Sequence, residues 1–122
     1  KNLFLRDKKR TYFLLTVTQD RDIDLKKLRS VIGAKGTLSF GSPEALMDLL
    51  GVKPGAVTPF SVMNDQDRNV TAFFDKSLIE ISTINAHPLR NDMTTTLYIS
   101  DLLKFMKDEN HHPILIDFDD ID

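Results

Sequence analysis

Residues 1–17, KNLFLRDKKRTYFLLTV, decide how this chain begins to fold. Two runs rich in aromatic and aliphatic residues, LFL and TYFLLTV, flank the charged cluster RDKKR. Because aromatic and β-branched residues favour strands and a charged cluster resists burial, this stretch predicts two β-strands joined by a polar turn. Lys1 and Asn2 precede the first apolar residue, and no apolar pattern requires them. On the pattern alone they are typical of a frayed terminus.

Helix signals recur along the rest of the chain. Residues 22–33 predict a helix that begins near Asp22 or Asp24 and ends at Gly33. Residues 41–51, GSPEALMDLLG, give the clearest signal, because Ser42 suits the N-cap and Gly51 suits a left-handed C-terminal stop. A third helix is predicted over residues 101–109, started by Ser100 or Asp101.

Short strand signals alternate with these helices, at residues 37–40, 69–74, 84–89, 94–100 and 113–118. Residues 52–65 are rich in Pro and Gly and predict a loop, and residues 75–80 predict a turn or short helix. Two of the connections resemble hairpins. We therefore expect an α+β fold with a mixed sheet curled into a partial barrel, rather than a doubly wound parallel sheet.

The composition limits the classes of function. The 122 residues fit one domain, 1–122, that can bury a core without disulfides or metals. The absence of cysteine excludes a thiolate metal site and a cysteine nucleophile, and it fits a cytoplasmic location. The apolar runs are too short to span a membrane. The chain does not begin with Met, so we expect it to start inside a longer product.

The net charge of −2 lacks the basic balance of a protein that binds nucleic acid over a wide surface. Any RNA contact must therefore be local. The basic residues gather in the first turn and the first helix, where a solvated surface is the commoner explanation. These residues are Lys1, Arg6, Lys8, Lys9 and Arg10, with Lys26, Lys27, Arg29 and Lys35 as further members.

No standard catalytic motif is present. Ser42 lacks a nucleophile elbow and is explained as a helix cap. Asp65 and Asp67 lie in a stretch that lacks the glycine and glutamate of a calcium loop, so we expect a turn. The neighbouring pair His111 and His112 is expected in a surface loop, since adjacent strand residues point to opposite faces.

Two features remain as candidates. His87 ends an apolar strand just before a proline, where a side chain can be held at the rim of a sheet, although a structural histidine is the commoner outcome. The loop at residues 53–60, KPGAVTPF, has prolines and a glycine that can leave backbone N–H groups free to face an oxyanion. A plain connection between helix and strand explains this loop equally well.

Four stretches together resemble the YbaK/ProX family of prolyl-tRNA editing domains. They are KNLFLRDK at residues 1–8, SFGSPEALMDLLG at 39–51, the G-x-x-x-P element at 55–59 with Phe60, and NAHPL at 85–89. The resemblance covers nearly the whole chain in the family order. It implies a mixed, mostly antiparallel sheet with flanking helices, and it needs no metal or organic cofactor. The Lys-Asn pair resembles the branch that deacylates alanyl-tRNA(Pro), whereas the cysteinyl-tRNA(Pro) branch has Lys-Thr.

The resemblance also implies roles for residues. Lys1 matches the family's functional lysine, which holds the acceptor end of the tRNA and the reacting ester, and Asn2 is its neighbour. His87 would lie near the terminal adenosine or the aminoacyl group. The loop that lines the aminoacyl pocket corresponds to Gly55, Ala56, Val57, Thr58, Pro59 and Phe60. The partners implied are mischarged aminoacyl-tRNA(Pro) and prolyl-tRNA synthetase.

The implied chemistry is hydrolysis by a positioned water without a covalent intermediate, because an aminoacyl ester is already activated. A synthetase site sized for proline also accepts alanine, since one missing methylene costs only about 1–3 kcal/mol of binding. One departure stands out: family members carry a segment ahead of the lysine, whereas here Lys1 comes first.

Three alternatives stay open. The first is a deacylase for cysteinyl-tRNA(Pro) or another small aminoacyl-tRNA. The second is a non-catalytic module that binds tRNA, and the third is an interaction domain of a synthetase complex.

Overall fold

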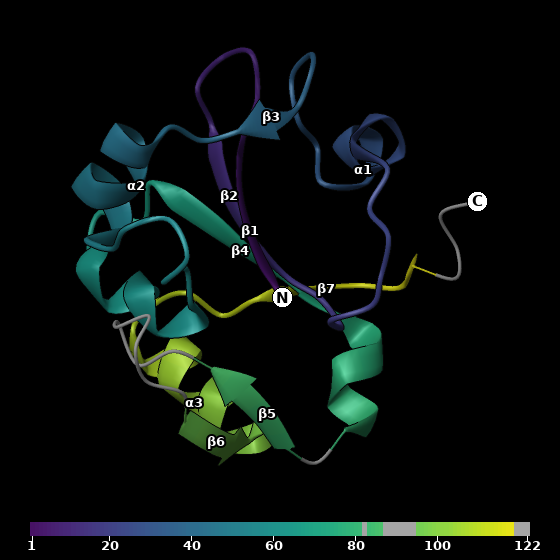
Figure 1. Cartoon of the computed structure of the whole chain (residues 1–122), viewed down its shortest axis with the longest axis vertical. Coiled ribbons are helices and arrows are strands. Elements are labelled where there is room, and N and C mark those ends of the chain that lie inside the picture. Colours follow the sequence, from purple (N-terminus) through teal and green to yellow (C-terminus); the bar gives the residue numbers. More distant parts are fainter. Residues whose placement is uncertain (82, 87–94, 119–122) are drawn as a thin grey trace.

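The computed structural model describes residues 1–81, 83–86 and 95–118 (Figure 1). Its centre is a five-stranded sheet with the order β3-β1-β2-β4-β7. The strands are β1 (Asn2–Arg6), β2 (Tyr12–Thr16), β3 (Ser39–Phe40), β4 (Val70–Asp75) and β7 (Ile114–Ile116). A second, two-stranded sheet pairs β5 (Thr83–Ala86) with β6 (Thr95–Tyr98).

The central sheet is mixed, as expected. The pairs β3-β1 and β1-β2 are antiparallel, whereas β2-β4 and β4-β7 are parallel. The expectation of a mostly antiparallel sheet is therefore correct for only half of this sheet. The curl into a partial barrel is not confirmed, because β3 and β7 are edge strands in the described part of the chain. The parallel pairs arise because helical crossovers return the chain in the same direction.

Two predicted helices are confirmed with their caps. In α1 (Leu25–Val31) the Asp24 carboxylate accepts from the N–H of Lys26 at 2.9 Å. In α2 (Pro43–Leu50) the Ser42 hydroxyl accepts from the N–H of Ala45 at 3.1 Å, and Gly51 stops the helix with φ 69°. These side chains satisfy backbone groups that a helix end leaves free.

Two boundaries differ from the prediction. The helix α3 (Ile99–Asp108) begins directly after β6, so neither Ser100 nor Asp101 is its cap, and the N-cap residue Tyr98 makes no side-chain capping bond. The stretch predicted as a loop at residues 52–65 contains a 3-10 helix, η1 (Pro59–Asn64), whereas residues 75–80 form the expected short helix, η2 (Lys76–Glu80). The Thr58 hydroxyl starts η1 by accepting from the N–H of Phe60 at 3.3 Å.

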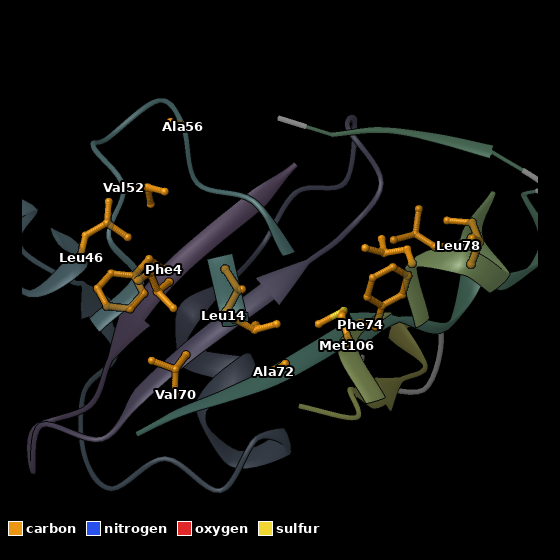
Figure 2. Close-up of a cluster of buried hydrophobic side chains, with 14 residues drawn as sticks. Phe4, Leu14, Leu46, Val52, Ala56, Val70, Ala72, Phe74, Leu78 and Met106 are labelled. Carbon is orange, nitrogen blue, oxygen red and sulfur yellow. The ribbon is translucent and has the colours of Figure 1, made fainter. Parts of the chain in front are cut away.

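Both faces of the central sheet are buried, in two separate hydrophobic clusters. Phe4, Leu14 and Phe74 point to the face covered by α2, α3 and the 3-10 helices. Figure 2 shows these side chains in that cluster. Leu5 and Phe13, one residue away on the same strands, point to the opposite face, which α1 covers. Because successive strand residues alternate between faces, burial on both sides explains the continuous apolar runs of β1, β2 and β4.

The structure corrects the interpretation of the histidine pair. His112 is exposed, but His111 is only 5% exposed and its Nε2 lies 3.0 Å from Oδ2 of Asp65, which is 3% exposed. Its Nδ1 lies 2.7 Å from the carbonyl oxygen of Glu109. Both ring nitrogens of His111 therefore lie within hydrogen-bond distance of an oxygen atom. Asp65 also accepts from the N–H of Val70 at 2.7 Å, so the pair joins the start of β4 to the end of α3.

We expect His111→Ala to destabilise the fold by about 3 kcal/mol, because it leaves the buried Asp65 carboxylate without its partner. Urea unfolding followed by circular dichroism measures this. His112→Ala is the matched control and should change the free energy of unfolding by less than about 0.5 kcal/mol. Equal effects of the two substitutions would show that the buried pair does not stabilise the protein.

Candidate functional site

A cleft of about 760 Å³ lies at the end of the sheet where β1 begins and β2 ends. Four segments line it. They are residues 1–2, residues 16–20, the alternate loop positions 55, 57 and 59, and a fourth segment around η2 and β5 that contributes Leu78, Ile81 and residues 83–85. The first and third segments contain five of the residues that the sequence singled out.

Lys1 is held in the sheet rather than frayed. Its backbone nitrogen donates to the carbonyl oxygen of Val17 at 2.7 Å, and the N–H of Val17 donates back to the carbonyl of Lys1 at 2.9 Å. Its side chain lines the cleft. Among the residues described, no carboxylate lies within 4.0 Å of the Lys1 ammonium group. A cation on a strand end, without an internal partner, is thus available to an anionic or carbonyl ligand.

Asn2 connects the sheet to the loop opposite. Its Nδ2 donates to the carbonyl oxygen of Val57 at 3.3 Å, and its Oδ1 accepts from the hydroxyl of Thr16 at 2.7 Å. Asn2 and Thr16 are direct partners in the β1-β2 register, so their side chains lie on the same face of the sheet. Thr16 is 1% exposed. This chain of contacts fixes the distance between Lys1 and residues 55–59.

The loop contributes to both the cleft and the core. Gly55 and Val57 line the cleft, Pro59 lines it while being largely buried, and the side chains of Ala56 and Thr58 are buried behind it. Gly55 has φ 90°, a conformation that favours glycine. Outside the five loop positions, Phe60 packs its ring against Phe105 with the centroids 5.4 Å apart. The predicted contacts of Ala56, Thr58 and Phe60 with a ligand therefore remain predictions, and their side chains support the loop from behind.

Two backbone donors of the same loop are unpaired. Within the described residues the N–H groups of Gly55 and Val57 make no hydrogen bond, whereas the N–H of Ala56 donates to the carbonyl of Lys53 at 3.0 Å. Free N–H groups beside a cleft can stabilise an oxyanion. A cation on one wall and unpaired N–H groups on the other are the chemical features of this cleft.

Asp75 anchors the wall formed by residues 18–20. Its carboxylate accepts from Nε of Arg21 at 2.6 Å and from the N–H of Thr18 at 3.4 Å. Ser77 donates to it through both its hydroxyl, at 2.7 Å, and its N–H, at 3.0 Å. Burial by itself would raise the pKa of Asp75, but these hydrogen bonds outweigh burial and lower the pKa below its ordinary value.

Some of the cleft residues were missed by sequence reasoning. Thr16 and residues 17–20 follow from the hairpin register, because the partner of Asn2 must also lie at the cleft. Leu78, Ile81, Thr83 and Ile84 carry no sequence signal, because they reach the cleft only through tertiary packing, whereas Asn85 belongs to the NAHPL stretch. His87 lies outside the described residues. Within the described part of the chain, no three His, Asp or Glu side chains are grouped to hold a metal ion.

Comparisons with known proteins give a consistent result. The aminoacyl-tRNA editing domain family matches residues 1–105. The prolyl-tRNA editing protein ProX of Acetoanaerobium sticklandii is 44% identical over 108 residues, which cover 88% of this chain and 65% of that protein. The prolyl-tRNA synthetase associated domain-containing protein 1 of Danio rerio is 38% identical over 98% of this chain and 65% of its own length. The chain thus spans about two thirds of these relatives.

The fold has a solved counterpart. A crystal structure provisionally described as a trans-editing enzyme for prolyl tRNA synthetase superimposes with a TM-score of 0.74 at 20% identity, over 96% of this chain and 67% of that one. Separately, none of the helices in the described residues has the length and apolar character needed to cross a membrane.

The lowered pKa of Asp75 predicts a pH-dependent stability. The ionised carboxylate stabilises the folded chain above the ordinary pKa of 3.8, and this contribution is lost as the pH falls through the lower folded value. We expect Asp75→Asn to cost about 2 kcal/mol at pH 7 and progressively less below pH 4. Thermal unfolding from pH 7 to pH 2 measures this convergence.

Asp48→Asn, at an exposed position of α2, is the control and should leave the melting temperature nearly unchanged at every pH. A constant difference between wild type and Asp75→Asn down to pH 2 would contradict the assigned role of the ionised Asp75.

Proposed function

This chain belongs to the aminoacyl-tRNA editing domain family, and we propose that it hydrolyses the aminoacyl ester of mischarged alanyl-tRNA(Pro). Cysteinyl-tRNA(Pro) is the runner-up substrate. The observation that carries the proposal is that Lys1, whose ammonium group has no ion-pair partner among the described residues, lines the same cleft as Gly55 and Val57, whose N–H groups make no hydrogen bond there.

The proposed mechanism uses these two walls. Lys1 holds the phosphate or ester of the acceptor end, and the N–H groups of the loop stabilise the negative charge that develops on the carbonyl oxygen. A water molecule attacks the carbonyl carbon, the tetrahedral intermediate breaks its bond to the ribose oxygen, and that oxygen takes up the proton lost by the attacking water. No covalent enzyme intermediate is needed, because the ester is already activated and the cleft supplies position and charge.

The residues that line the cleft favour water over a protein nucleophile. In the part that the structure describes, they include no serine, cysteine or histidine, and Asp20 is the only carboxylate. Among the described residues, none of the cleft threonine hydroxyls is hydrogen-bonded to a carboxylate or a histidine that could activate it. His87 keeps its proposed place near the terminal adenosine or aminoacyl group, which the resemblance implies.

The choice of alanine rests on pocket size. A synthetase site for proline cannot exclude alanine by size, so a second pocket must accept alanine and exclude the larger proline. Val57 and Pro59 are the apolar loop residues on the cleft wall and are our candidates for that exclusion. The names of the relatives support prolyl-tRNA synthetase as a working partner, and we propose the cytoplasm as the location.

Lys1→Ala should lower kcat/KM for alanyl-tRNA(Pro) by about 100-fold, because one preorganised charge contact with the reacting ester is lost. Deacylation of alanyl-, cysteinyl- and prolyl-tRNA(Pro) by wild type and variant measures this. Lys104→Ala, an exposed position on α3, is the control and should keep wild-type activity. Hydrolysis of prolyl-tRNA(Pro) as fast as the alanyl form would contradict the proposed selectivity.

Thr16→Val removes the hydroxyl that holds Asn2 while keeping the shape of the side chain, so the link from Asn2 to Val57 should loosen. We expect kcat/KM to fall about tenfold, chiefly through kcat, because the loop N–H groups act in the transition state. Thr16→Ser retains the donor and should recover most of the activity. Equal activity of the Val and Ser variants would exclude this positioning role.

A further inference from the structure

Two loops that are far apart in the sequence meet at the end of the molecule away from the cleft. They are the β1-β2 turn and the loop between α1 and β3, which lie together at the top of Figure 1. The N–H of Lys8 donates to the carbonyl oxygen of Lys35 at 3.1 Å. Gly36 has φ 83°, and a Cβ built there would lie 2.9 Å from the Cβ of Lys8, so the two loops are in close contact.

A buried carboxylate holds this junction. Asp7 is 2% exposed, and its two oxygens accept from the backbone N–H groups of Lys9 at 3.0 Å, Thr11 at 2.8 Å and Lys35 at 2.9 Å. Burial by itself would raise the pKa of Asp7, but these three hydrogen bonds lower it, so the group stays ionised at neutral pH. Because the ionised Asp7 carboxylate accepts hydrogen bonds from both loops, it fixes the backbone position of each loop.

The two loops that meet at this junction carry four cationic residues, which we call the basic patch: Lys8, Lys9, Arg10 and Lys35. All four residues are exposed, and among the described residues none of their charged groups lies within 4.0 Å of a carboxylate. The chain has 16 cationic residues and 18 acidic ones, so this concentration runs against its overall balance. Such a local concentration of positive charge attracts a polyanion.

The basic patch and the cleft lie at opposite ends of β1. The strand β1 runs from Asn2 at the cleft to Arg6 beside the patch, a length of about 17 Å for its five residues. A nucleic-acid strand carries a phosphate every few ångströms of its length, so an RNA with its 3′ end in the cleft can extend over the patch. The ester-bearing end and the body of the RNA then contact the protein at opposite ends of β1.

We propose that the basic patch binds the phosphate backbone of the RNA substrate, away from the reacting end. This inference rests on the proposed function for the identity of the substrate. Because lysine and arginine contact phosphates without reading bases, the patch contributes affinity and orientation but no sequence preference. The chemical step remains with the cleft, so loss of the patch should raise KM and leave kcat unchanged.

The test compares two double variants with the same change of charge. Lys9→Gln/Lys35→Gln removes two cations of the patch and keeps the backbone N–H groups that bind Asp7. Lys104→Gln/Lys107→Gln removes two exposed cations of α3, at the opposite end of the molecule in Figure 1. Binding of uncharged tRNA(Pro) is measured by fluorescence anisotropy from 50 to 300 mM salt, with thermal melts to verify folding.

The patch variant should bind about tenfold more weakly at 150 mM salt, and its slope of log K against log salt should be shallower by about 1.4–1.8, for two lost phosphate contacts. The α3 variant should match wild type. If wild type binds tRNA and the patch variant shows the same affinity and slope, the basic patch is not the RNA surface. If wild type binds no tRNA, the proposed function fails together with this inference.

Discussion

The antiparallel pairing of β1 with β2 is the constraint on which the rest of the structure depends. Its register places Asn2 opposite Thr16 at one end and Arg6 opposite Tyr12 at the other. The first end holds the cleft and the second end leads into the turn that Asp7 organises. Because side chains alternate strictly along a strand, a shift of this register by one residue would exchange the two hydrophobic faces and break the contact between Asn2 and Thr16.

Burial on both faces of the sheet gives the cleft rigid walls. The Phe4 and Leu14 face packs under α2 and η1, and the loop at residues 55–59 is continuous with η1. Thr58 starts this helix while its neighbours Val57 and Pro59 face the cleft. The buried side chains of Ala56 and Thr58 therefore support this loop from behind, which is how the proposed oxyanion donors would be held in place.

Buried carboxylates supply the remaining positional control. Asp75 ties residues 18–21 to the end of β4, Asp65 pairs with His111 to join β4 to α3, and Asp7 joins two loops through three N–H groups. Each is almost fully buried and each accepts hydrogen bonds from segments that the chain order keeps apart. Buried acids of this kind are tolerated because their hydrogen bonds offset the cost of desolvation.

The sequence by itself determined the local structure: the first hairpin, the capped helices α1 and α2, the α+β class and, through several short motifs, the family to which the chain belongs. These features depend on neighbouring residues, and periodicity and capping encode them directly. Only the tertiary structure decided the parallel pairing of β4 with β2 and β7, the burial of His111 and the contact of Thr16 with Asn2. These features depend on contacts between residues that are far apart in the sequence, and the sequence carries no local signal for such contacts.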